Sequence, residues 1–230
     1  MSITIKNLSH TYTTPGLPPR PVIHPIPHWH IPTNTQLILR GISGSGKTTL
    51  FNILAGLLQP TTGTILFNDT DLYALSESQR DRFRNQAIGY VFQMHHLLPM
   101  LTAAQNVAMP LAFAGQPKNE RRPRALHLLD QVGLADHAHN RPAQMSTGQR
   151  LRVAIARAIA NKPQLLLADE PTAALDPATS DTILGLLQQT CAQNNTILIL
   201  ASHDPAIFDR FNHIYNLHEG HLDLPVPAHQ

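Results

Sequence analysis

Residues 41–48 read Gly-Ile-Ser-Gly-Ser-Gly-Lys-Thr, a glycine-rich stretch that ends in a lysine and a hydroxyl residue. An apolar run with strand character precedes it at 36–39, and a helical pattern of leucine and isoleucine follows it. A strand, a glycine loop of this spacing and a helix together are typical of a phosphate-binding loop. The sequence therefore predicts a nucleotide-phosphate site where a strand gives way to a helix.

Each residue type in this loop has a chemical role. Glycines let the backbone approach closely, so that N–H groups point at phosphate oxygens beside the positive end of the following helix. The Lys47 ammonium can pair with the β- and γ-phosphates, and the Thr48 hydroxyl can bind Mg²⁺. A lone glycine loop is more often a simple turn, but the flanking strand and helix favour phosphate binding. The residues expected to contact the nucleotide are Gly41, Ser43, Gly44, Ser45, Gly46, Lys47, Thr48 and Thr49.

Strand and helix patterns alternate along most of the chain. Several apolar runs are continuous, which is typical of strands buried on both faces of a sheet. Residues 102–160 carry only helix signals, beginning with a capping pattern at 102–105. These patterns predict an α/β fold with a largely parallel sheet and a helical subdomain inserted into it. The predicted strands are 3–5, 36–39, 64–67, 88–92, 165–168, 197–200 and 213–217.

Composition excludes several classes of protein. Charged residues are 14% of the chain, against roughly 25% in an ordinary soluble protein, yet no apolar run approaches the roughly 18–20 residues of a membrane span. The start shows no basic region followed by an apolar stretch, so we expect no export signal. Cys191, the single cysteine, cannot form an internal disulfide or a multi-thiolate zinc site. A net charge of +2 gives no reason to expect nucleic acid, and a cytoplasmic protein is the expectation.

A second motif follows the apolar run at 165–168, where Asp169 and Glu170 come next in the sequence. Residues just past the carboxyl end of a parallel strand face the ligand crevice. Asp169 can then bind Mg²⁺, directly or through water, and Glu170 can polarise an attacking water. In isolation such a pair is often a solvated acidic turn. Beside a phosphate loop, it predicts hydrolysis of the bound nucleotide.

Residues 145–149, Met-Ser-Thr-Gly-Gln, resemble the signature sequence of the ATP-binding-cassette (ABC) ATPases. By this resemblance Ser146, Gly148 and Gln149 contact a nucleotide, and Ser146 is also a suitable N-cap for the helix that follows. Thr147 stands where the family has its first signature glycine, and its β-branched side chain predicts slower but not abolished activity.

Further elements of the family follow the expected order along nearly the whole chain. By resemblance, Tyr12 stacks on adenine, and Gln93 links the γ-phosphate and Mg²⁺ to the helical subdomain. His203 matches the histidine that contacts the γ-phosphate, and 174–176 match the loop that crosses a dimer interface, with Asp176 near the nucleotide. The catalytic set implied is Lys47, Gln93, Glu170 and His203, and the Mg²⁺ set is Thr48, Gln93 and Asp169.

The resemblance also implies an architecture. It is a P-loop NTPase (RecA-like) core with a mostly parallel sheet, an N-terminal antiparallel β subdomain and an inserted α-helical subdomain. One ABC ATPase domain would span 1–230, with the core at 1–93 and 161–230 and the signature-bearing helices at 94–160. The family implies a head-to-tail homodimer that binds two ATP with Mg²⁺, each site combining one chain's phosphate loop with the other's signature.

The segments 84–99 and 101–111 narrow the resemblance to the ATPase subunits of lipoprotein-release and macrolide-export systems. This implies a separate integral membrane permease as partner, a peripheral position on the inner membrane and no direct contact with nucleic acid. The alternatives are a cassette that transmits force to an envelope complex without transport, and a soluble cassette that acts on nucleic acid or ribosomes. The expected docking residues are His95, His96, Leu97, Leu98 and Met100, unless these pack inside the helical subdomain.

Two other features stand out. The proline-rich segment 15–32 excludes helix and suits an edge strand or an extended loop, and it departs from the charged strands usual in the family. Histidines at 24, 28, 30, 137 and 139 have no thiol or acidic companion at metal-ligand spacing, so we interpret them as surface side chains.

Overall fold

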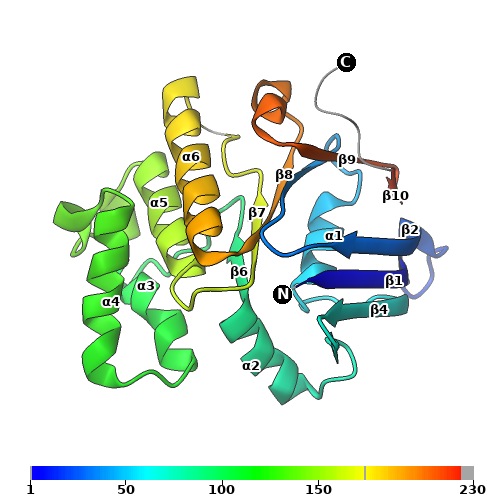
Figure 1. The fold of residues 1–230 in the computed structure, drawn as a ribbon, viewed down its shortest axis with the longest axis horizontal. Coiled ribbons are helices and arrows are strands. Elements are labelled where there is room, and N and C mark those ends of the chain that lie inside the picture. The colour runs from blue at the N-terminus through cyan, green and yellow to red at the C-terminus, as the bar shows by residue number, and fades with distance from the viewer. Residues whose placement is uncertain (1, 174, 224–230) are drawn as a thin grey trace.

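The structure is a computed structural model that describes residues 2–173 and 175–223. Figure 1 shows a group of helices on one side of a central sheet and a second sheet on its other side. The predicted fold class is confirmed, including the antiparallel N-terminal sheet and the helical insertion. Ala174, the first residue of the predicted interface loop, lies outside the described residues.

The N-terminal sheet is antiparallel, and the proline-rich segment supplies its edge. Proline lacks the N–H needed for a central ladder, so β2 lies at the edge of this sheet and pairs with β1, with Tyr12 opposite Arg20 in the register. The expectation of an edge strand within 15–32 is therefore confirmed. In sheet order the strands are β2 (Arg20–Ile31), β1 (Ile3–Tyr12), β4 (Thr62–Phe67) and β5 (Thr70–Asp71).

The central sheet is parallel except for its last, two-residue strand. Every residue of β7 and β8 is buried, which explains why both strands are continuously apolar in the sequence. All seven predicted strands are present, although β1 is longer than predicted and β6 ends one residue earlier. In sheet order the strands are β10 (His221–Leu222), β9 (His213–His218), β3 (Gln36–Arg40), β8 (Ile197–Ser202), β7 (Leu165–Asp169) and β6 (Ile88–Val91).

The predicted helical stretch holds α3, α4 and α5, which pack on one another beside the central sheet (Figure 1). The capping pattern at 102–105 is confirmed, because Thr102 and Gln105 exchange side-chain-to-backbone bonds at the start of α3. The helices are α1 (Lys47–Leu54), α2 (Glu77–Ala87), α3 (Ala103–Phe113), α4 (Lys118–Gln131), α5 (Thr147–Ala158) and α6 (Pro177–Asn194), and the 3₁₀ turns are Ala135–His137, Pro142–Gln144 and Pro205–Arg210.

Among the described residues, buried side chains form two cores that share the central sheet. Leu166 and Leu198 face the core built with α3 to α6, whereas Leu167 and Ile199 face the core around α1 and the antiparallel sheet. The sheet therefore fixes the phosphate loop on one side and the signature helix on the other. None of the helices in residues 2–173 and 175–223 combines the length and apolar character that a bilayer crossing requires.

Candidate functional site

The phosphate loop joins β3 to α1 in a conformation that only glycine accommodates at key positions. Gly44 and Gly46 have φ of +80° and +107°, in the left-handed region that side chains disfavour. A Cβ on Gly41 would lie 2.5 Å from the Leu217 carbonyl oxygen, so this residue must also stay small. The helix begins at Lys47, and its free N–H groups open toward the loop.

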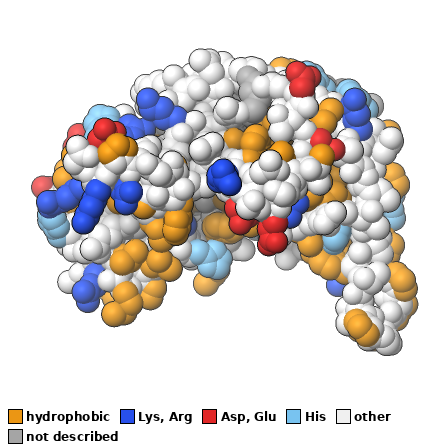
Figure 2. All heavy atoms as spheres, turned by 90° about the horizontal axis from the view of Figure 1, so that it is seen from below, with side chains coloured by type: hydrophobic (Ala, Val, Ile, Leu, Met, Phe, Trp, Pro, Cys, Tyr) orange, Lys and Arg blue, Asp and Glu red, His pale blue; other side chains and the backbone are white. Residues whose placement is uncertain are grey.

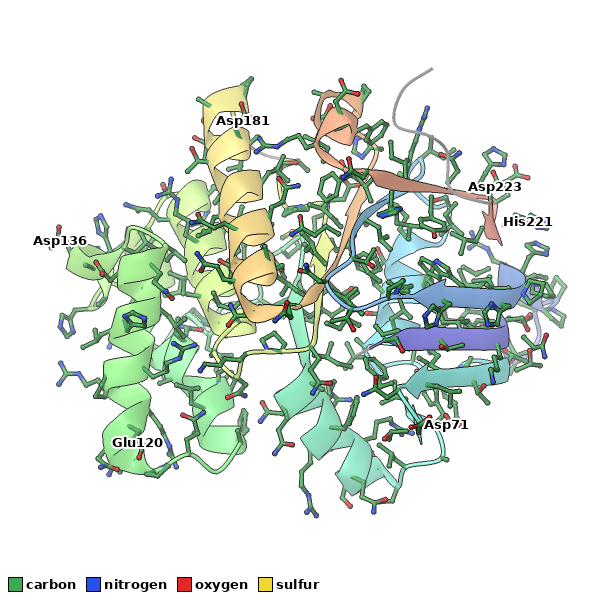
Figure 3. The ribbon with its side chains drawn as sticks, in the orientation of Figure 1. Asp71, Glu120, Asp136, Asp181, His221 and Asp223 are labelled. Carbon is green, nitrogen blue, oxygen red and sulfur yellow. The ribbon has the colours of Figure 1, made fainter. Side chains whose placement is uncertain are left out.

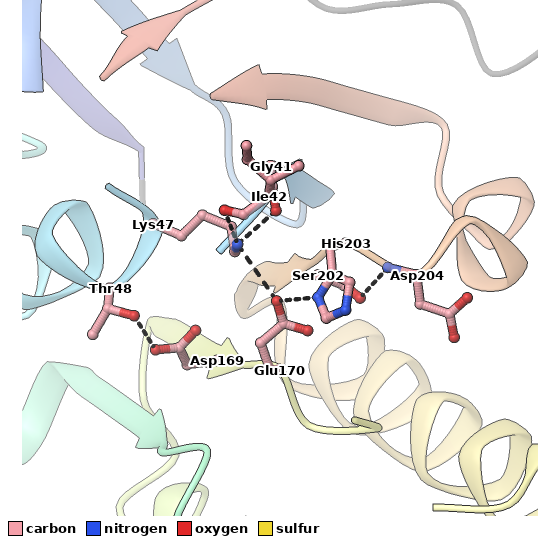
Figure 4. A network of polar contacts seen from close by, with 9 residues as sticks. All are labelled: Gly41, Ile42, Lys47, Thr48, Asp169, Glu170, Ser202, His203 and Asp204. Carbon is pink, nitrogen blue, oxygen red and sulfur yellow. Dashed lines mark hydrogen bonds and ion pairs between the residues drawn. The ribbon is translucent and has the colours of Figure 1, made fainter. Parts of the chain in front are cut away.

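Lys47 is held over the loop by polar contacts on several sides (Figure 4). Its Nζ donates to the carbonyls of Gly41 at 2.6 Å and Ile42 at 3.0 Å, and lies 3.5 Å from Oε1 of Glu170. The side chain is only 7% exposed, so its charge acts in a medium that screens weakly. A phosphate in the loop would meet an ammonium already in position.

Thr48 and Asp169 face each other at the end of β7. The Thr48 hydroxyl donates to Oδ2 of Asp169 at 2.9 Å (Figure 4). Burial and the neighbouring Glu170 raise the pKa of Asp169, while the Thr48 hydrogen bond and Lys47 oppose the rise. A hydroxyl and a carboxylate oxygen side by side are donors that suit a hard cation such as Mg²⁺.

Glu170 stands beside the phosphate loop because β7 ends one residue earlier and the chain turns there. Its φ is +48°, an uncommon value for a residue with a side chain, and such values concentrate at functional sites. Its Oε1 lies 2.9 Å from Nδ1 of His203, which follows β8, and the carboxylate is 10% exposed against 61% for the histidine. The pair thus offers a shielded carboxylate with a solvent-facing imidazole next to it.

These residues line one cleft of about 320 Å³ at the carboxyl edge of the central sheet. Gln93, two residues after β6, reaches the same cleft. Gly41 and Ser45 belong to the loop but do not line the cleft, and Ser45 is buried. The lining residues are Tyr12, Arg20, Val22, Ser43, Gly44, Gly46, Lys47, Thr48, Thr49, Gln93, Asp169, Glu170 and His203.

Tyr12 lines the cleft and is 41% exposed. Its hydroxyl is 3.4 Å from Oγ1 of Thr49, and its ring packs edge-on against His10 with centroids 4.6 Å apart. Arg20, which the sequence did not indicate, lines the same cleft because it pairs with Tyr12 across β1 and β2. The signal that could have found it is the arginine at the start of a hairpin strand opposite the aromatic residue.

The signature residues lie at the start of α5, outside the cleft just described. Ser146 caps α5 by accepting from the Gln149 backbone N–H at 3.2 Å, and it donates its own N–H to the Gln149 side chain at 2.9 Å. Ser146 is exposed, Gly148 is half-buried and a Cβ there would meet Thr179 at an ordinary 3.6 Å. None of these residues lines the cleft of their own chain among the residues described.

Asp176 caps α6 next to the signature. Its carboxylate accepts from the Thr179 backbone at 3.0 Å and from the Thr179 hydroxyl at 2.6 Å, and these bonds hold its pKa below the usual value. Because a Cβ on Gly148 would reach Thr179 and Leu175, the interface-loop residues and the signature form one surface.

A larger groove of about 580 Å³ lies between α2, α3 and the end of α5. Of the expected docking residues, His96 lines this groove, Leu97 packs against the helical core, and Leu98 and Met100 are exposed. His95 is half-buried, and burial together with Arg150 and Arg157 lowers its pKa. Figure 2 shows hydrophobic side chains gathered on the helical lobe at the left. The groove is lined by Ala55, Leu57, Asp81, Arg82, Arg84, Asn85, Ile88, Gly89, Tyr90, Phe92, His96, Met109, Pro110, Phe113, Arg157, Ala158, Asn161 and Pro163.

Among the described residues, no group of three or more histidine, cysteine or acidic side chains could hold a metal ion. His221 stacks on His24 with ring centroids 3.8 Å apart, which joins β10 to β2. Figure 3 places Glu120, Asp136 and Asp181 at separate points on the periphery, and none of the three lines the cleft.

Comparison with known proteins shows that the chain is similar to ABC transporter ATP-binding proteins. The family described as "ABC transporter" matches residues 27–173. The chain is 44% identical over 187 residues to the lipoprotein-releasing system ATP-binding protein LolD of Legionella pneumophila (strain Paris), covering 81% of this chain and 82% of the relative. It is equally 44% identical over 186 residues to LolD 2 of Caulobacter vibrioides, with 81% and 82% covered.

Two solved structures resemble the chain over nearly all of its length. The dimeric post-hydrolysis structure of the ATP-binding cassette MJ0796, bound to ADP and Pi, superposes with a TM-score of 0.90 at 33% identity and covers 99% of both chains. A second dimeric structure of MJ0796 gives a TM-score of 0.90 at 34% identity over the same 99%.

Proposed function

The chain belongs to the ABC transporter family of ATP-hydrolysing cassettes, and from this we propose that it powers a separate inner-membrane permease in lipoprotein release. The observation that carries the proposal is the convergence of Lys47, Thr48, Asp169, Glu170 and His203 on one cleft. The likeness to LolD proteins supports the lipoprotein-release branch over other transport systems.

ATP would bind with its phosphates in the glycine loop, where backbone N–H groups and Lys47 neutralise charge. The ring of Tyr12 would stack on adenine. Thr48 and Asp169, with Gln93 on the same cleft, are the oxygen donors that would hold Mg²⁺. Mg²⁺, when bound, neutralises charge that develops on the transferred phosphoryl group.

Glu170 is the residue we assign as general base. Its carboxylate is shielded, oriented by His203 and close to Lys47, so it can take a proton from a water that attacks the γ-phosphate. His203, which lies beside this carboxylate and is exposed, would contact the same γ-phosphate. Gln93 leads directly into 95–96, whose carbonyls bind Arg157 of the signature helix at 2.6 Å, and so joins the cleft to α5.

Each site would be completed by a second copy of the chain. The signature residues Ser146, Gly148 and Gln149 are outside their own chain's cleft but present polar groups at the N-terminus of α5, which attracts anions. A head-to-tail dimer would bring this terminus onto the partner's nucleotide, beside Asp176. The two MJ0796 structures are dimers, which supports this arrangement.

The 580 Å³ groove is the proposed docking site for the permease. Phe113, exposed over most of its side chain, and Tyr90, Phe92 and Met109 give it an apolar surface that a partner would cover. Docking there would hold the chain on the inner face of the membrane. The runner-up is a cassette that transmits force to an envelope complex without transport.

The test is purification of the tagged chain from membranes, followed by reconstitution of any co-purifying membrane protein in vesicles with an acylated lipoprotein. The proposal predicts a permease that co-purifies and ATP-dependent release of the lipoprotein. Phe113→Glu should abolish co-purification, whereas Leu17→Glu, an exposed residue outside the groove, should not. ATP use that activates an envelope enzyme without release would favour the runner-up, and salt-sensitive RNA binding without a membrane partner would favour a nucleic-acid role.

A further inference from the structure

The side chain of Gln149 is held at both ends of its amide. Its Oε1 accepts from the Ser146 backbone N–H at 2.9 Å, and its Nε2 lies 3.1 Å from Nε2 of His137. The first bond requires the amide oxygen to face Ser146. The amide nitrogen therefore faces His137 as a donor.

The orientation of the Gln149 amide determines the tautomer of His137. A ring nitrogen can accept an N–H only through a free lone pair, so the proton of neutral His137 resides on Nδ1. Nδ1 lies 3.1 Å from Nδ2 of Asn140, and a half-turn of that amide presents its oxygen to the Nδ1–H. A continuous chain of hydrogen bonds then runs from Asn140 through His137 and Gln149 to Ser146.

The turn that carries His137 is hydrogen-bonded to the start of α3 through its backbone. The backbone N–H of Ala103 donates to the Asn140 carbonyl at 2.8 Å, and that of Ala104 donates to the Ala138 carbonyl at 3.0 Å. Both donors are in the first turn of α3. The turn that carries the imidazole is thereby fixed by main-chain bonds to α3, while the imidazole itself bonds to Gln149 in the first turn of α5. This is the kind of supporting contact that keeps a site in register.

We propose that His137 is a positioning residue of the signature: its Nε2 holds the Gln149 amide, which in turn holds the Ser146 backbone that meets the partner's nucleotide. This inference rests on the proposed function, because the signature acts on nucleotide only in the dimer. His137 itself touches no nucleotide. It acts on the cap of α5, so its loss should weaken closure of the dimer while the phosphate loop of the single chain keeps its affinity for ATP.

The experiment compares four variants, each alone and combined with Glu170→Gln, which prevents turnover. His137→Leu and His137→Phe remove the acceptor in two shapes, and His137→Gln supplies a new acceptor oxygen. His139→Leu is the matched control, because this exposed histidine lies two residues along the same turn. The readouts are ATP affinity of the single chain at low protein concentration, the ATP-dependent dimerisation constant, kcat, and melting temperature as a check of folding.

Loss of one net hydrogen bond predicts dimerisation about 3- to 10-fold weaker in the Leu and Phe variants, with kcat lowered alike. His137→Gln and His139→Leu should behave as the parent, and ATP affinity of the single chain should stay within about twofold in all four. Parental dimerisation in both Leu and Phe variants would overturn the inference, as would an equal defect in His137→Gln. If the Glu170→Gln parent stays monomeric with saturating ATP, the proposed function itself is wrong, and the assignment of His137 is wrong with it.

Discussion

Glu170→Gln should abolish hydrolysis while ATP binding survives. Glutamine keeps the shape of the side chain and an oxygen that accepts from His203 Nδ1 at 2.9 Å, so the change removes charge and basicity with little else. General-base catalysis contributes roughly 10²- to 10⁴-fold, which corresponds to about 3–5 kcal/mol of barrier. We therefore expect kcat to fall by at least about 100-fold.

The neighbouring ammonium determines the effect on binding. The carboxylate of Glu170 lies 3.5 Å from Lys47 Nζ, a gross attraction of about 5 kcal/mol at an effective dielectric constant near 20. Removing that carboxylate leaves Lys47 freer to bind phosphate, so ATP affinity should be unchanged or higher.

Two assays separate these effects: steady-state phosphate release gives kcat, and binding of a fluorescent ATP analogue gives affinity. Glu120→Gln, an exposed carboxylate on the periphery in Figure 3, is the matched control and should hydrolyse ATP at the parental rate. Hydrolysis by Glu170→Gln within about tenfold of the parent would refute the role of this carboxylate as general base.

Three further changes test other parts of the account. Arg20→Ala should weaken ATP binding by about 2- to 5-fold at low salt and less at high salt, because this exposed cation lines the cleft beside Tyr12, its partner across β1 and β2. Titrations of ATP binding at two salt concentrations measure the change. Thr147→Gly should raise kcat by about 5-fold at most, because it removes a β-branched side chain at the start of α5. The gain is limited because Arg150 loses its hydrogen bond to the Thr147 hydroxyl. An unchanged or lower kcat would contradict this expectation. Burial lowers the pKa of His10, so the unfolded chain binds more protons below pH 6.5, and stability present above that pH is lost as pH falls toward the folded-state pKa. Between about pH 7.5 and 5.5, the melting temperature of His10→Phe should therefore fall less than that of the parent. The difference should be about 2–4 °C for each kcal/mol that protonation of His10 costs the folded parent. Equal falls in the two proteins would contradict this link between His10 and stability.

The parts of the site that are local in sequence could be predicted from it. The phosphate loop is contiguous, and its strand, glycines and helix all lie within residues 36–54. Asp169 and Glu170 were found because the buried strand before them is continuously apolar. The order of the remaining motifs supplied Gln93 and His203, which the fold brings to the same cleft.

What sequence reasoning missed depends on tertiary pairing or on weak patterns. Arg20 reaches the cleft only through the register of β1 and β2. The hydrogen bond between His137 and Gln149 depends on how the turn packs against α5. Helix α2 was not predicted, because Ala87 is its single buried residue and the sequence therefore shows no apolar stripe there. Ser76 and Gln79 form a capping box, which is the signal that could have indicated the start of this helix.

The central claim is that each ATP site joins the phosphate loop of one chain to the signature of another, and cross-linking tests it most directly. Ser43 and Ser146 are both exposed, and the native Cys191 is buried, so single cysteines can be introduced at either position in separately tagged chains that also carry Glu170→Gln. With ATP, the account predicts a disulfide between a Ser43→Cys chain and a Ser146→Cys chain, and little without ATP. Links confined to chains that carry the same cysteine, or links indifferent to ATP, would contradict it.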